Sequence, residues 1–575
     1  MRWEKKNPSF TTIEQVIEYN SGTTVQELLF SQENDEDPYL FGLDQCVNVV
    51  RNCIEKGMEI SVVGDYDADG VTSTTILSLG LEEITGKKPE IHIPKRFSEG
   101  YGLNISIVDK IPSHSLMITV DNGIAAVEQI HKAKEKGIVV VIIDHHIKRD
   151  DGKIPCADAV LDPCAVDGSD YTHYCGAGLA YRFIKALNPN TKLDKKLIAL
   201  AGIGTVADVM ILRGANRYIV KQSLKQVKEG YVTYGLFNLL QAVDMPVEPT
   251  ATDYGFKIGP CINASGRLYD DGGERVYSLL SKDCVPNSYE MFEMQQEVRA
   301  MAQEIIDTNE RRKELVFNTM QTVDENMKYV EKTAPIIYYQ HGLHEGIVGI
   351  IAGKLAEKNN MPATVLTDST KEGVLKGSGR SVPEVHLKKL LDRSSKYLLG
   401  YGGHAGAAGL SLLSSNLEAF SKSIKADLAG VNLTPADICY YDLEITEAQI
   451  PQMAEYLKRY EPFGEGCSKV RFLLRNYTAS PKGSSHYVIM GSQKNHVKII
   501  GNNISLMGFG MAKRYEEDGF PANLDVIGEL GINYYNNQPF YQMEIIDYKI
   551  RNTKTKAYSD LANMLNFCLL YTSPS

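Results

Sequence analysis

The sequence predicts a multidomain α/β protein: a doubly wound parallel-sheet domain, a long helical connector, a second α/β domain and a small C-terminal β-barrel. Three observations lead to this fold class. Short apolar runs alternate with helical stretches over residues 59–211, an uninterrupted charged helical pattern covers residues 286–331, and strand-like segments dominate after Pro435. A chain of 575 residues is several times the usual domain length, so three or more compact units are expected.

The first α/β unit is predicted from buried strands separated by helices. Ser61–Val63, Leu116–Val120 and Val139–Ile143 are short apolar runs rich in β-branched residues, whereas Gly70–Glu83 and Ile124–Lys136 have helical spacing. Each strand is followed by a polar cluster. Because the carboxyl ends of parallel strands lie along one edge of the sheet, we expect these clusters to gather there.

The connector and the second unit follow. Residues 286–331 contain no glycine and a single proline at their start, and their apolar residues have helical spacing. A second α/β pattern runs from residue 335 to about 430, with strands at Ile336–Tyr339 and Thr364–Leu366 on either side of a helix at Gly346–Lys358.

The C-terminal part has the pattern of a small β-barrel, and an OB-fold is the first choice because many short strands occur with little helix. The expected strands are Val470–Tyr477, Tyr487–Met490, His496–Ile500, Ser505–Phe509, Leu524–Leu530 and a final pair that meets at Tyr535–Pro539. Residues 569–575 continue no pattern, so they are either disordered or foreign to the natural chain.

The composition is that of an ordinary globular protein, with 43% hydrophobic and 23% charged residues. No apolar run reaches the roughly 18 residues of a membrane helix, and the first ten residues lack a signal-peptide pattern, so we expect a cytoplasmic protein without a membrane partner. The ten cysteines include no C-x-x-C pair, which argues against a zinc site.

The charge balance disfavours a nucleic-acid partner, because 72 acidic residues outnumber 61 basic ones and the net charge is −11. Three segments are nevertheless locally basic: Lys87–Arg96, Arg311–Lys313 and His386–Lys396. Such clusters are more often solvated surfaces, so they permit DNA binding without establishing it.

The strongest chemical signal is a run of alternating aspartates directly after the first strand. Asp65, Asp67 and Asp69 are spaced i, i+2 and i+4, which places them on one side of an extended backbone. Three neighbouring negative charges are costly unless a cation neutralises them. A calcium loop of the EF-hand type is excluded because Ile76 stands where the bidentate glutamate is required.

Three further segments supply matching groups. Asp121 follows the second strand, the third strand ends in Asp144-His145-His146, and Asp208 ends a helical segment among apolar residues. Neighbouring side chains in an extended segment point in opposite directions, so only one of the two histidines is expected to bind the same metal. These ligands are rich in oxygen and lack thiolate, which suits Mn²⁺ or Mg²⁺, and their number favours two ions about 3.5–4 Å apart.

These residues resemble the four motifs of the DHH phosphoesterases, and further segments resemble the RecJ type within that family. The motifs are Asp65–Gly70, Asp121–Gly123, Asp144–His146 and Gly204–Asp208; the RecJ-like segments are Ser98–Leu103 and Asn263–Arg267. Gly377–Ser381 and Gly402–Gly409 resemble the companion DHHA1 domain, and Pro462–Gly466 resembles the start of the family's OB-fold. Cys467-Ser468 stands where the family often has Asn-Pro, which affects a turn and no catalytic residue.

The resemblance implies a role for each site residue. The metal ligands would be Asp67, Asp69, Asp121, His145 and Asp208, with Asp121 shared by both ions and Asp65 supporting the metal site. Together with His146, which would contact the scissile phosphate, these ligands would form the catalytic set. The substrate phosphates would be held by Ser378, Arg380, Ser381 and His404 of the second unit, and Arg267 is a weaker candidate for the same role.

The resemblance also implies a domain division. We expect an N-terminal segment at 1–40, a DHH catalytic domain at 41–245, a helical connector at 246–331, a DHHA1 substrate-binding domain at 332–430, an OB-fold domain at 431–552 and a tail at 553–575.

The implied activity is hydrolysis of single-stranded DNA from its 5′ end to 5′-mononucleotides, in DNA repair and recombination. Tyr534, Tyr535 and Tyr541 are candidates for stacking on bases, although such residues are more often ordinary sheet packing. The implied partners are single-stranded DNA, a helicase and a single-strand-binding protein, and the chain is expected to be a monomer.

Two other classes of protein are alternatives. A DHH phosphodiesterase for short oligonucleotides or small nucleotides would generally lack the β-barrel. A binding protein that had lost its catalytic ligands would not keep all of them, and every expected ligand is present.

Overall fold

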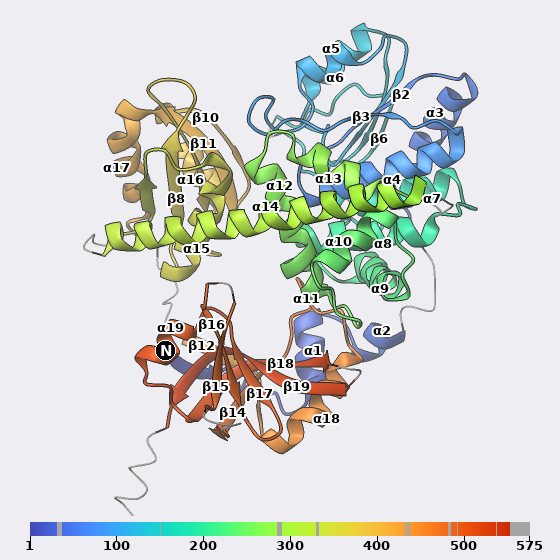
Figure 1. Ribbon diagram of the computed structural model, residues 1–575. Helices are drawn as coiled ribbons and strands as arrows, with labels where there is room; N and C mark the ends of the chain where they lie inside the picture. The colour runs from blue at the N-terminus through green and yellow to red at the C-terminus, as the bar shows by residue number, and fades with distance from the viewer. Residues whose placement is uncertain are drawn as a thin grey trace, which may run out of the picture.

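A computed structural model describes residues 1–30, 37–149, 151–283, 290–328, 333–431, 433, 438–480, 485–491, 493–535 and 538–551. The expected turn at residues 536–537 and the tail at 553–575 lie outside these residues. Figure 1 shows two α/β bodies side by side, a long helix that runs along both, and a β-rich body on the other side of that helix. Among the helices described, none combines the length and the apolar character needed to cross a bilayer.

The first body is built on a five-stranded parallel sheet. Its strand order is β3 (Glu90–His92), β2 (Ile60–Val63), β4 (Leu116–Val120), β5 (Val139–Ile143) and β6 (Ala159–Leu161). Its helices are α3 (Leu43–Glu55), α4 (Ala68–Thr85), α5 (Ile105–Lys110), α6 (Val127–Glu135), α7 (Gly176–Leu187), α8 (Asp194–Ala207), α9 (Gly214–Glu229), α10 (Tyr234–Ala242), α11 (Ala251–Asp253), α12 (Gly259–Leu268) and α13 (Gly272–Leu280), with a π-helical turn at Tyr254–Ile258 between α11 and α12. The parallel sheet predicted from the alternating pattern is confirmed.

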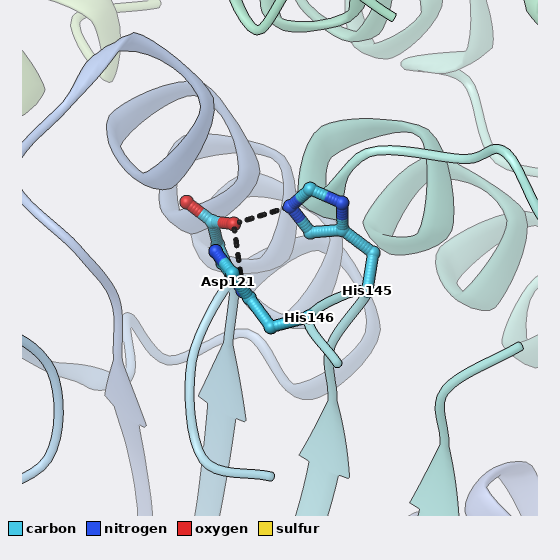
Figure 2. A group of neighbouring side chains, drawn as sticks. All are labelled: Asp121, His145 and His146. Carbon is cyan, nitrogen blue, oxygen red and sulfur yellow. Dashed lines mark hydrogen bonds and ion pairs between the residues drawn. The ribbon is translucent and has the colours of Figure 1, made fainter. Parts of the chain in front are cut away.

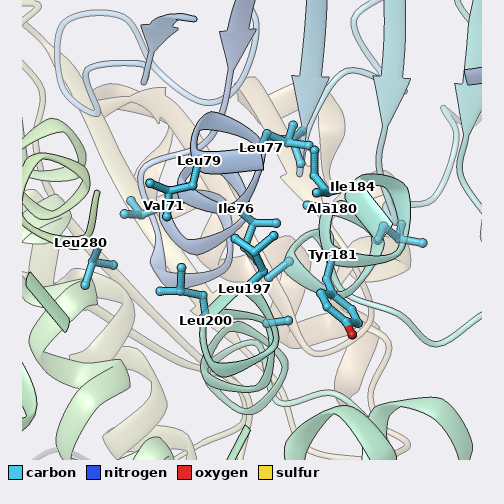
Figure 3. Close-up of a cluster of buried hydrophobic side chains, with 14 of the residues drawn as sticks. Val71, Ile76, Leu77, Leu79, Ala180, Tyr181, Ile184, Leu197, Leu200 and Leu280 are labelled. Atoms are coloured by element: carbon cyan, nitrogen blue, oxygen red, sulfur yellow. The ribbon is translucent and has the colours of Figure 1, made fainter. Parts of the chain in front are cut away.

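The core of this body surrounds α4, which is buried on all sides through its first fourteen residues. Figure 3 shows leucine and isoleucine side chains of α4 packed against α7 and α8, including Ile76 of α4, Ile184 of α7 and Leu197 of α8. The buried serine and threonine hydroxyls of α4 donate to carbonyl oxygens of the preceding helical turn, so the helix can be covered on every face. The start of α4, which carries the acidic residues, is therefore held rigidly.

The long helix α14 (Glu290–Met327) joins the first body to the second. Its 38 residues span about 57 Å at 1.5 Å per residue. The second body contains a sheet of order β10 (Leu398–Gly403), β11 (Ala407–Leu413), β9 (Val374–Arg380), β8 (Ala363–Asp368) and β7 (Ile336–Tyr339), in which only β7 and β8 are parallel. Its helices are α15 (Val348–Asn359), α16 (Leu387–Arg393) and α17 (Leu417–Leu428), and a 3-10 turn at Glu345–Ile347 precedes α15.

The third body is β-rich. Its mixed sheet has the order β13 (Leu443–Ile445), β14 (Arg471–Thr478), β18 (Asn523–Tyr535), β19 (Gln538–Ile550), β17 (Ser505–Gly508), β16 (His496–Ile500) and β15 (Tyr487–Met490). The strand β12 (Ile438–Tyr441) and the helices α18 (Ile450–Lys458) and α19 (Ala512–Glu517) complete it.

The N-terminal residues also belong to this third body. Strand β1 (Arg2–Lys5) pairs in parallel with β12, and α1 (Ile13–Ser21) and α2 (Val25–Phe30) follow. Phe10, Ile13 and Ile17 are buried in the same apolar core as the C-terminal strands. The chain thus begins in the β-rich body, builds both α/β bodies and returns to it (Figure 1).

The β-rich body is joined to the first body by a buried arginine. The guanidinium of Arg217 on α9 donates hydrogen bonds to the carbonyl oxygens of Tyr460 and Pro462, each at 2.6 Å, and to that of Glu461 at 3.2 Å. The backbone N–H of Leu212 donates to the carbonyl of Glu465 at 2.8 Å. Hydrogen bonds from a charged donor are roughly twice as strong as neutral ones, so this contact fixes the β-rich body beside the C-terminal end of α8.

Candidate metal centre

Four chain segments bring acidic and imidazole groups to one edge of the parallel sheet. The loops after β2, β4 and β5 leave neighbouring parallel strands at their carboxyl ends, and Asp208 is the residue that ends α8. The predicted convergence of these segments is therefore seen in the structure.

The first ligand group consists of Asp65, Asp67 and Asp121, whose ligand oxygens lie within 4.8 Å of one another. Asp65 is fully buried, and neither of its carboxylate oxygens has a hydrogen-bond partner among the described residues. Burial first, and then neighbouring carboxylates, raise the pKa of Asp65 and that of Asp121 well above the usual range. Unpaired buried carboxylates are costly, and a cation among them removes that cost, so these residues fit a divalent metal ion.

The second ligand group consists of Asp69, His145 and Asp208, again within 4.8 Å. The Nε2 atom of His145 lies 3.6 Å from Oδ2 of Asp69 and 3.8 Å from Oδ2 of Asp208. Burial and the charge of Asp69 raise the pKa of Asp208 to about 8, and burial lowers the pKa of His145. A neutral imidazole beside two carboxylates is a suitable set of ligands for Mn²⁺ or Mg²⁺.

Asp121 links the two groups. Its Oδ1 atom lies 3.0 Å from Nε2 of His145, and the same carboxylate belongs to the first group (Figure 2). Its backbone is left-handed, with φ of 59°, as the chain turns sharply after β4. Asn122 stabilises this turn, because its side-chain amide donates to the carbonyls of Gly64 and Val120, each at 2.9 Å.

The expectation that three aspartates share one side of an extended strand is wrong for Asp69. The extended backbone ends at Asp67, which caps α4 by accepting the N–H of Gly70 at 3.0 Å, and Asp69 lies in the first helical turn. Its carboxylate instead accepts the N–H groups of Gly176 and Ala177 at the start of α7, at 2.6 and 2.8 Å. A helix N-terminus stabilises negative charge, which explains why this carboxylate remains an available ligand although it is buried.

Two glycines allow α7 and α8 to approach this carboxylate. A Cβ at Gly176 would lie 2.7 Å from the Cβ of Asp121, and a Cβ at Gly204 would lie 2.9 Å from Oδ1 of Asp69. Both distances are shorter than real Cβ contacts, so larger residues would displace the ligands. The need for glycine at position 204 in the Gly204–Asp208 motif is therefore steric.

The expectation that the two histidines point apart is also wrong. Their ring centroids are 4.5 Å apart, and Nδ1 of His146 lies 4.0 Å from Oδ1 of Asp121, so both rings lie on the side of Asp121 (Figure 2). The alternation rule fails because both residues lie beyond the end of β5. There Oδ1 of Asp144 accepts the backbone N–H of His145 at 2.8 Å and that of His146 at 3.2 Å, which curls the chain around it.

Asp144 also sets the state of His146. Its Oδ1 atom lies 2.8 Å from Nδ1 of His146, and its Oδ2 atom accepts the N–H of Ile124 at 2.9 Å. Burial would lower the pKa of His146, but the hydrogen bond and charge of Asp144 outweigh it and raise the pKa to about 9. Nε2 of His146 lies 3.1 Å from the hydroxyl of Tyr101. An imidazolium held in this way can donate to an anionic substrate.

The basic residues predicted to hold phosphate lie on both α/β bodies. The guanidinium of Arg380, at the end of β9, donates to Oγ of Ser378 at 2.7 Å and to the carbonyl of Gly379 at 2.8 Å. Burial, then the charges of Arg96 and Arg380, lower the pKa of Arg267 to about 10, and burial, Arg380 and His146 lower the pKa of His404. These groups are therefore close enough to act on one another across the boundary between the bodies.

Ser381 is placed differently from the other predicted phosphate ligands. Its hydroxyl donates to the carbonyl of Val385 at 2.6 Å, which occupies its only proton. Its side chain thus stabilises the turn after β9 in this structure.

Sequence reasoning gave no role to several residues of the site. Arg96 lies over the ring of Tyr66 at 4.8 Å, and Oδ1 of Asn263 accepts the N–H of Ala68 at the start of α4 at 3.0 Å. Arg96 ends a predicted basic segment, and Tyr101 and Asn263 lie in the two RecJ-like segments. The basic segment and the two RecJ-like segments could therefore be recognised in the sequence, but their patterns did not indicate which residue of each segment faces the site.

The three candidate stacking tyrosines are not all open to solvent. The hydroxyl of Tyr534 accepts a hydrogen bond from Nζ of Lys458 at 3.0 Å, and Tyr541 donates to Glu455 at 3.2 Å, so both contact α18. The side chain of Tyr535 lies outside the described residues.

Comparisons with known proteins agree with this geometry. Three family models match the chain: the DHH family N-terminal domain over residues 59–205, the DHHA1 domain over 328–430 and the RecJ OB domain over 441–547. These matches confirm the predicted fold class, including the OB-fold at the C-terminal end.

Curated relatives and solved structures point the same way. The single-stranded-DNA-specific exonuclease RecJ of Dickeya dadantii is 31% identical over 467 residues, which cover 75% of this chain and 78% of that protein. The protein of the same name from Bacillus subtilis is 29% identical over 583 residues, 95% of this chain and 70% of that protein. The crystal structure of RecJ from Thermus thermophilus in complex with Mn²⁺ has a TM-score of 0.76 at 25% identity and covers 96% of this chain and 80% of that one.

Proposed function

Because this chain belongs to the family of RecJ single-stranded-DNA-specific exonucleases, we propose that it hydrolyses single-stranded DNA from the 5′ end and releases 5′-mononucleotides. The observation that carries the proposal is the pair of ligand groups joined by Asp121. His146, which neighbours Asp121, lies within electrostatic range of His404 of the second body, and so does Arg380. Two adjacent cations facing a phosphate-binding surface are the arrangement used for displacement at phosphorus.

In this proposal Asp67, Asp69, Asp121, His145 and Asp208 hold two Mn²⁺ or Mg²⁺ ions, and Asp65 completes the first ligand group. When bound, such ions lower the pKa of a water molecule and neutralise negative charge that develops at the phosphoryl group.

The residues of the chain supply the remaining chemistry. His146, kept protonated by Asp144, donates a hydrogen bond to a non-bridging oxygen of the scissile phosphate. Arg380 carries a fixed positive charge, and Ser378 orients its guanidinium. His404 and Arg267 add donors on either side. A preorganised set of donors of this kind stabilises the transition state because it needs no rearrangement during the reaction.

The substrate class follows from where the bodies meet. Gly346, in the turn before α15, is so close to α12 that a Cβ would lie 1.8 Å from the carbonyl oxygen of Arg267. Since the two bodies touch there, the proposed substrate reaches the metal centre between them as the end of a single strand. The domains at 41–245 and 332–430 would then hold the end of the strand, and the domain at 431–552 would bind the following nucleotides.

The proposed setting is DNA repair and recombination in the cytoplasm. The enzyme would act as a monomer on single strands that a helicase exposes and a single-strand-binding protein covers.

The proposal is tested by digestion of 5′- and 3′-labelled single-stranded DNA with Mn²⁺, beside duplex DNA and a dinucleotide. Immediate release of the 5′ label as a mononucleotide, abolished in Asp121→Ala and kept in Asp167→Ala, is the expected result. Asp167 is an exposed aspartate that belongs to none of the candidate ligand groups, and it serves as the matched control. Rapid hydrolysis of the dinucleotide with intact long strands would instead assign the chain to phosphodiesterases of small substrates.

A further inference from the structure

A polar cavity of about 320 Å³ lies where the helices α12, α13 and α14 meet (Figure 1). Its walls carry three carboxylates, three hydroxyls, one guanidinium and the apolar side chains of Met301 and Ile305. None of the residues in these walls belongs to the metal centre or to the proposed phosphate-binding set. The cavity therefore needs an explanation of its own.

This cavity and the metal centre lie on different sides of α12. Ser265 lines the cavity, whereas Arg267 lines a separate cavity of about 480 Å³ together with Arg312 and with Ala207, which precedes the metal ligand Asp208. Two positions along a helix correspond to a rotation of roughly 200°, so the side chains of Ser265 and Arg267 point to nearly opposite sides. A ligand in the polar cavity would not block the proposed path of the substrate.

The walls carry an excess of negative charge. The Nε atom of Arg275 lies 3.0 Å from Oδ1 of Asp271, and its Nη1 atom pairs with Glu304 of α14. Glu274 has no ion pair among the residues that the structure describes. Three carboxylates against one guanidinium leave two negative charges in excess. A ligand of this cavity is therefore expected to be a cation.

A buried hydroxyl on the wall gives an independent indication of a ligand. Ser265 is only 2% exposed, and its hydroxyl makes no hydrogen bond to another described residue. The hydroxyl of Thr308, also on the wall, instead donates to the carbonyl of Glu304 at 2.7 Å. A buried hydroxyl without a partner is unfavourable, and its oxygen can accept a hydrogen bond from an ammonium group.

The spacing of the carboxylates distinguishes between kinds of cation. Among the described residues, the sets of three ligand atoms close enough to hold one metal ion all belong to the metal centre. The negative charges of this cavity are spread apart, and the same walls offer Met301 and Ile305 as apolar surface. Separated charges with apolar surface suit a molecule with ammonium groups joined by methylenes. The volume equals that of about ten water molecules, which is enough for a short chain of this kind.

We propose that this cavity binds an aliphatic diamine or polyamine. One ammonium group lies against Glu274 and donates to the hydroxyl of Ser265, the second lies against the excess charge of Asp271 and Glu304, and the methylenes cover the apolar wall. The proposal goes beyond nuclease activity. It gives α12, whose Asn263 accepts the N–H of Ala68 at the start of α4 at 3.0 Å, a ligand that ties it to α13 and α14.

The test is isothermal titration of the full chain with 1,4-diaminobutane in saturating Mn²⁺, so that the carboxylates of the metal centre are already occupied. One site per chain is expected. Glu274→Gln should weaken binding about 5-fold through loss of an ion pair, and Ser265→Ala about 10-fold through loss of a hydrogen bond to a charged group. Glu229→Gln is the matched control, because Glu229 is an exposed glutamate at the end of α9 and does not line the cavity.

Two further comparisons locate the ligand. Ser278 is exposed on the wall, so Ser278→Lys keeps the fold, places an ammonium group of the protein there and should abolish binding. Hydrogen exchange of the α12 amides should slow when the diamine is added to the unaltered protein and to Glu229→Gln.

Three results would overturn the proposal: no binding by the unaltered protein, equal affinity in Glu274→Gln and Glu229→Gln, or equally tight binding of butylamine, which has a single ammonium group. Unchanged exchange in α12 despite binding would place the diamine elsewhere and would overturn it as well. Since no DNA is present, none of these results depends on the proposed function.

Discussion

Manganese should stabilise this protein against unfolding in two separable steps, because the proposed ligands include two groups that share no residue, Asp65, Asp67 and Asp121 on one side and Asp69, His145 and Asp208 on the other. Asp65 belongs only to the first group and Asp208 only to the second, whereas Asp121 belongs to the first and contacts His145 of the second at 3.0 Å. The informative changes are therefore Asp65→Asn, Asp208→Asn and Asp121→Asn. Each keeps the size of the side chain and removes one negative ligand.

The magnitude follows from the number of ions. An ion present at 100 times its Kd adds about 2.7 kcal/mol to the free energy of unfolding, so two independent ions add about 5 kcal/mol. For a body of this size, 1 kcal/mol changes the Tm by about 2–4 °C, which gives a total rise of about 10–20 °C. Asp65→Asn and Asp208→Asn should each keep about half of that rise, and Asp121→Asn should keep almost none.

The assay is calorimetric unfolding after dialysis against EDTA, repeated with increasing MnCl₂, while isothermal titration counts the ions. Burial and the neighbouring charge of Asp67 disfavour a carboxylate at Asp65, so its replacement by asparagine should not lower the Tm of the metal-free protein. Asp167→Asn is the control outside the site. If Asp65→Asn keeps the full manganese-dependent rise, or if the unaltered protein binds a single ion, the division into two groups is refuted.

Three further outcomes are expected. Burial raises the pKa of Asp208 in the folded, metal-free protein to about 8, whereas the unfolded chain releases this proton near pH 4. The free energy of unfolding of the metal-free protein should therefore fall as the pH rises from about 4 to about 8. Mn²⁺ should make this dependence on pH weaker when unfolding is followed by calorimetry. Asp144→Asn should return the pKa of His146 from about 9 towards 6.5, so that its protonated fraction at pH 8 falls from about nine-tenths to a few hundredths by NMR of the metal-free protein. Gly346→Ala should lower kcat about 100-fold, because the added Cβ moves the two bodies apart, and it should leave the manganese-dependent rise in Tm unchanged. Gly353→Ala is the control and should stay active, because the nearest neighbouring atom is 3.9 Å from the added Cβ. Full activity of Gly346→Ala, or an unchanged His146 titration, would contradict the respective argument.

The strands of the first body could be predicted closely because their signal is local. Leu116–Val120 and Val139–Ile143 are buried on both faces, and the structure has the same bounds for β4 and β5. Parallel topology then places Asp121 and Asp144 at one edge without further information. The presence of an acidic centre can therefore be predicted from the local sequence of single segments.

Side-chain directions at the centre could not be predicted, because they depend on contacts between segments. Asp69 is held by the start of α7, more than a hundred residues later, and the histidine rings follow the curl around Asp144 rather than the alternation of a strand. The position of the N-terminal residues in the β-rich body could not be predicted either, because β1 pairs with β12, which lies more than 400 residues later in the sequence. Amphipathic spacing shows that a face is buried, but not against which partner.

The net charge of −11 is no objection to a DNA substrate, because the distribution of charge decides where a polyanion can bind. Each of the three predicted basic segments contributes to the surface between the bodies: Arg96 acts on Arg267, Arg312 lines the same cavity as Arg267, and His386 acts on His404. Meanwhile much of the acidic excess at this edge of the sheet is concentrated in the ligand groups, where divalent cations would neutralise it. The same chain can therefore be acidic as a whole and cationic along the path of its substrate.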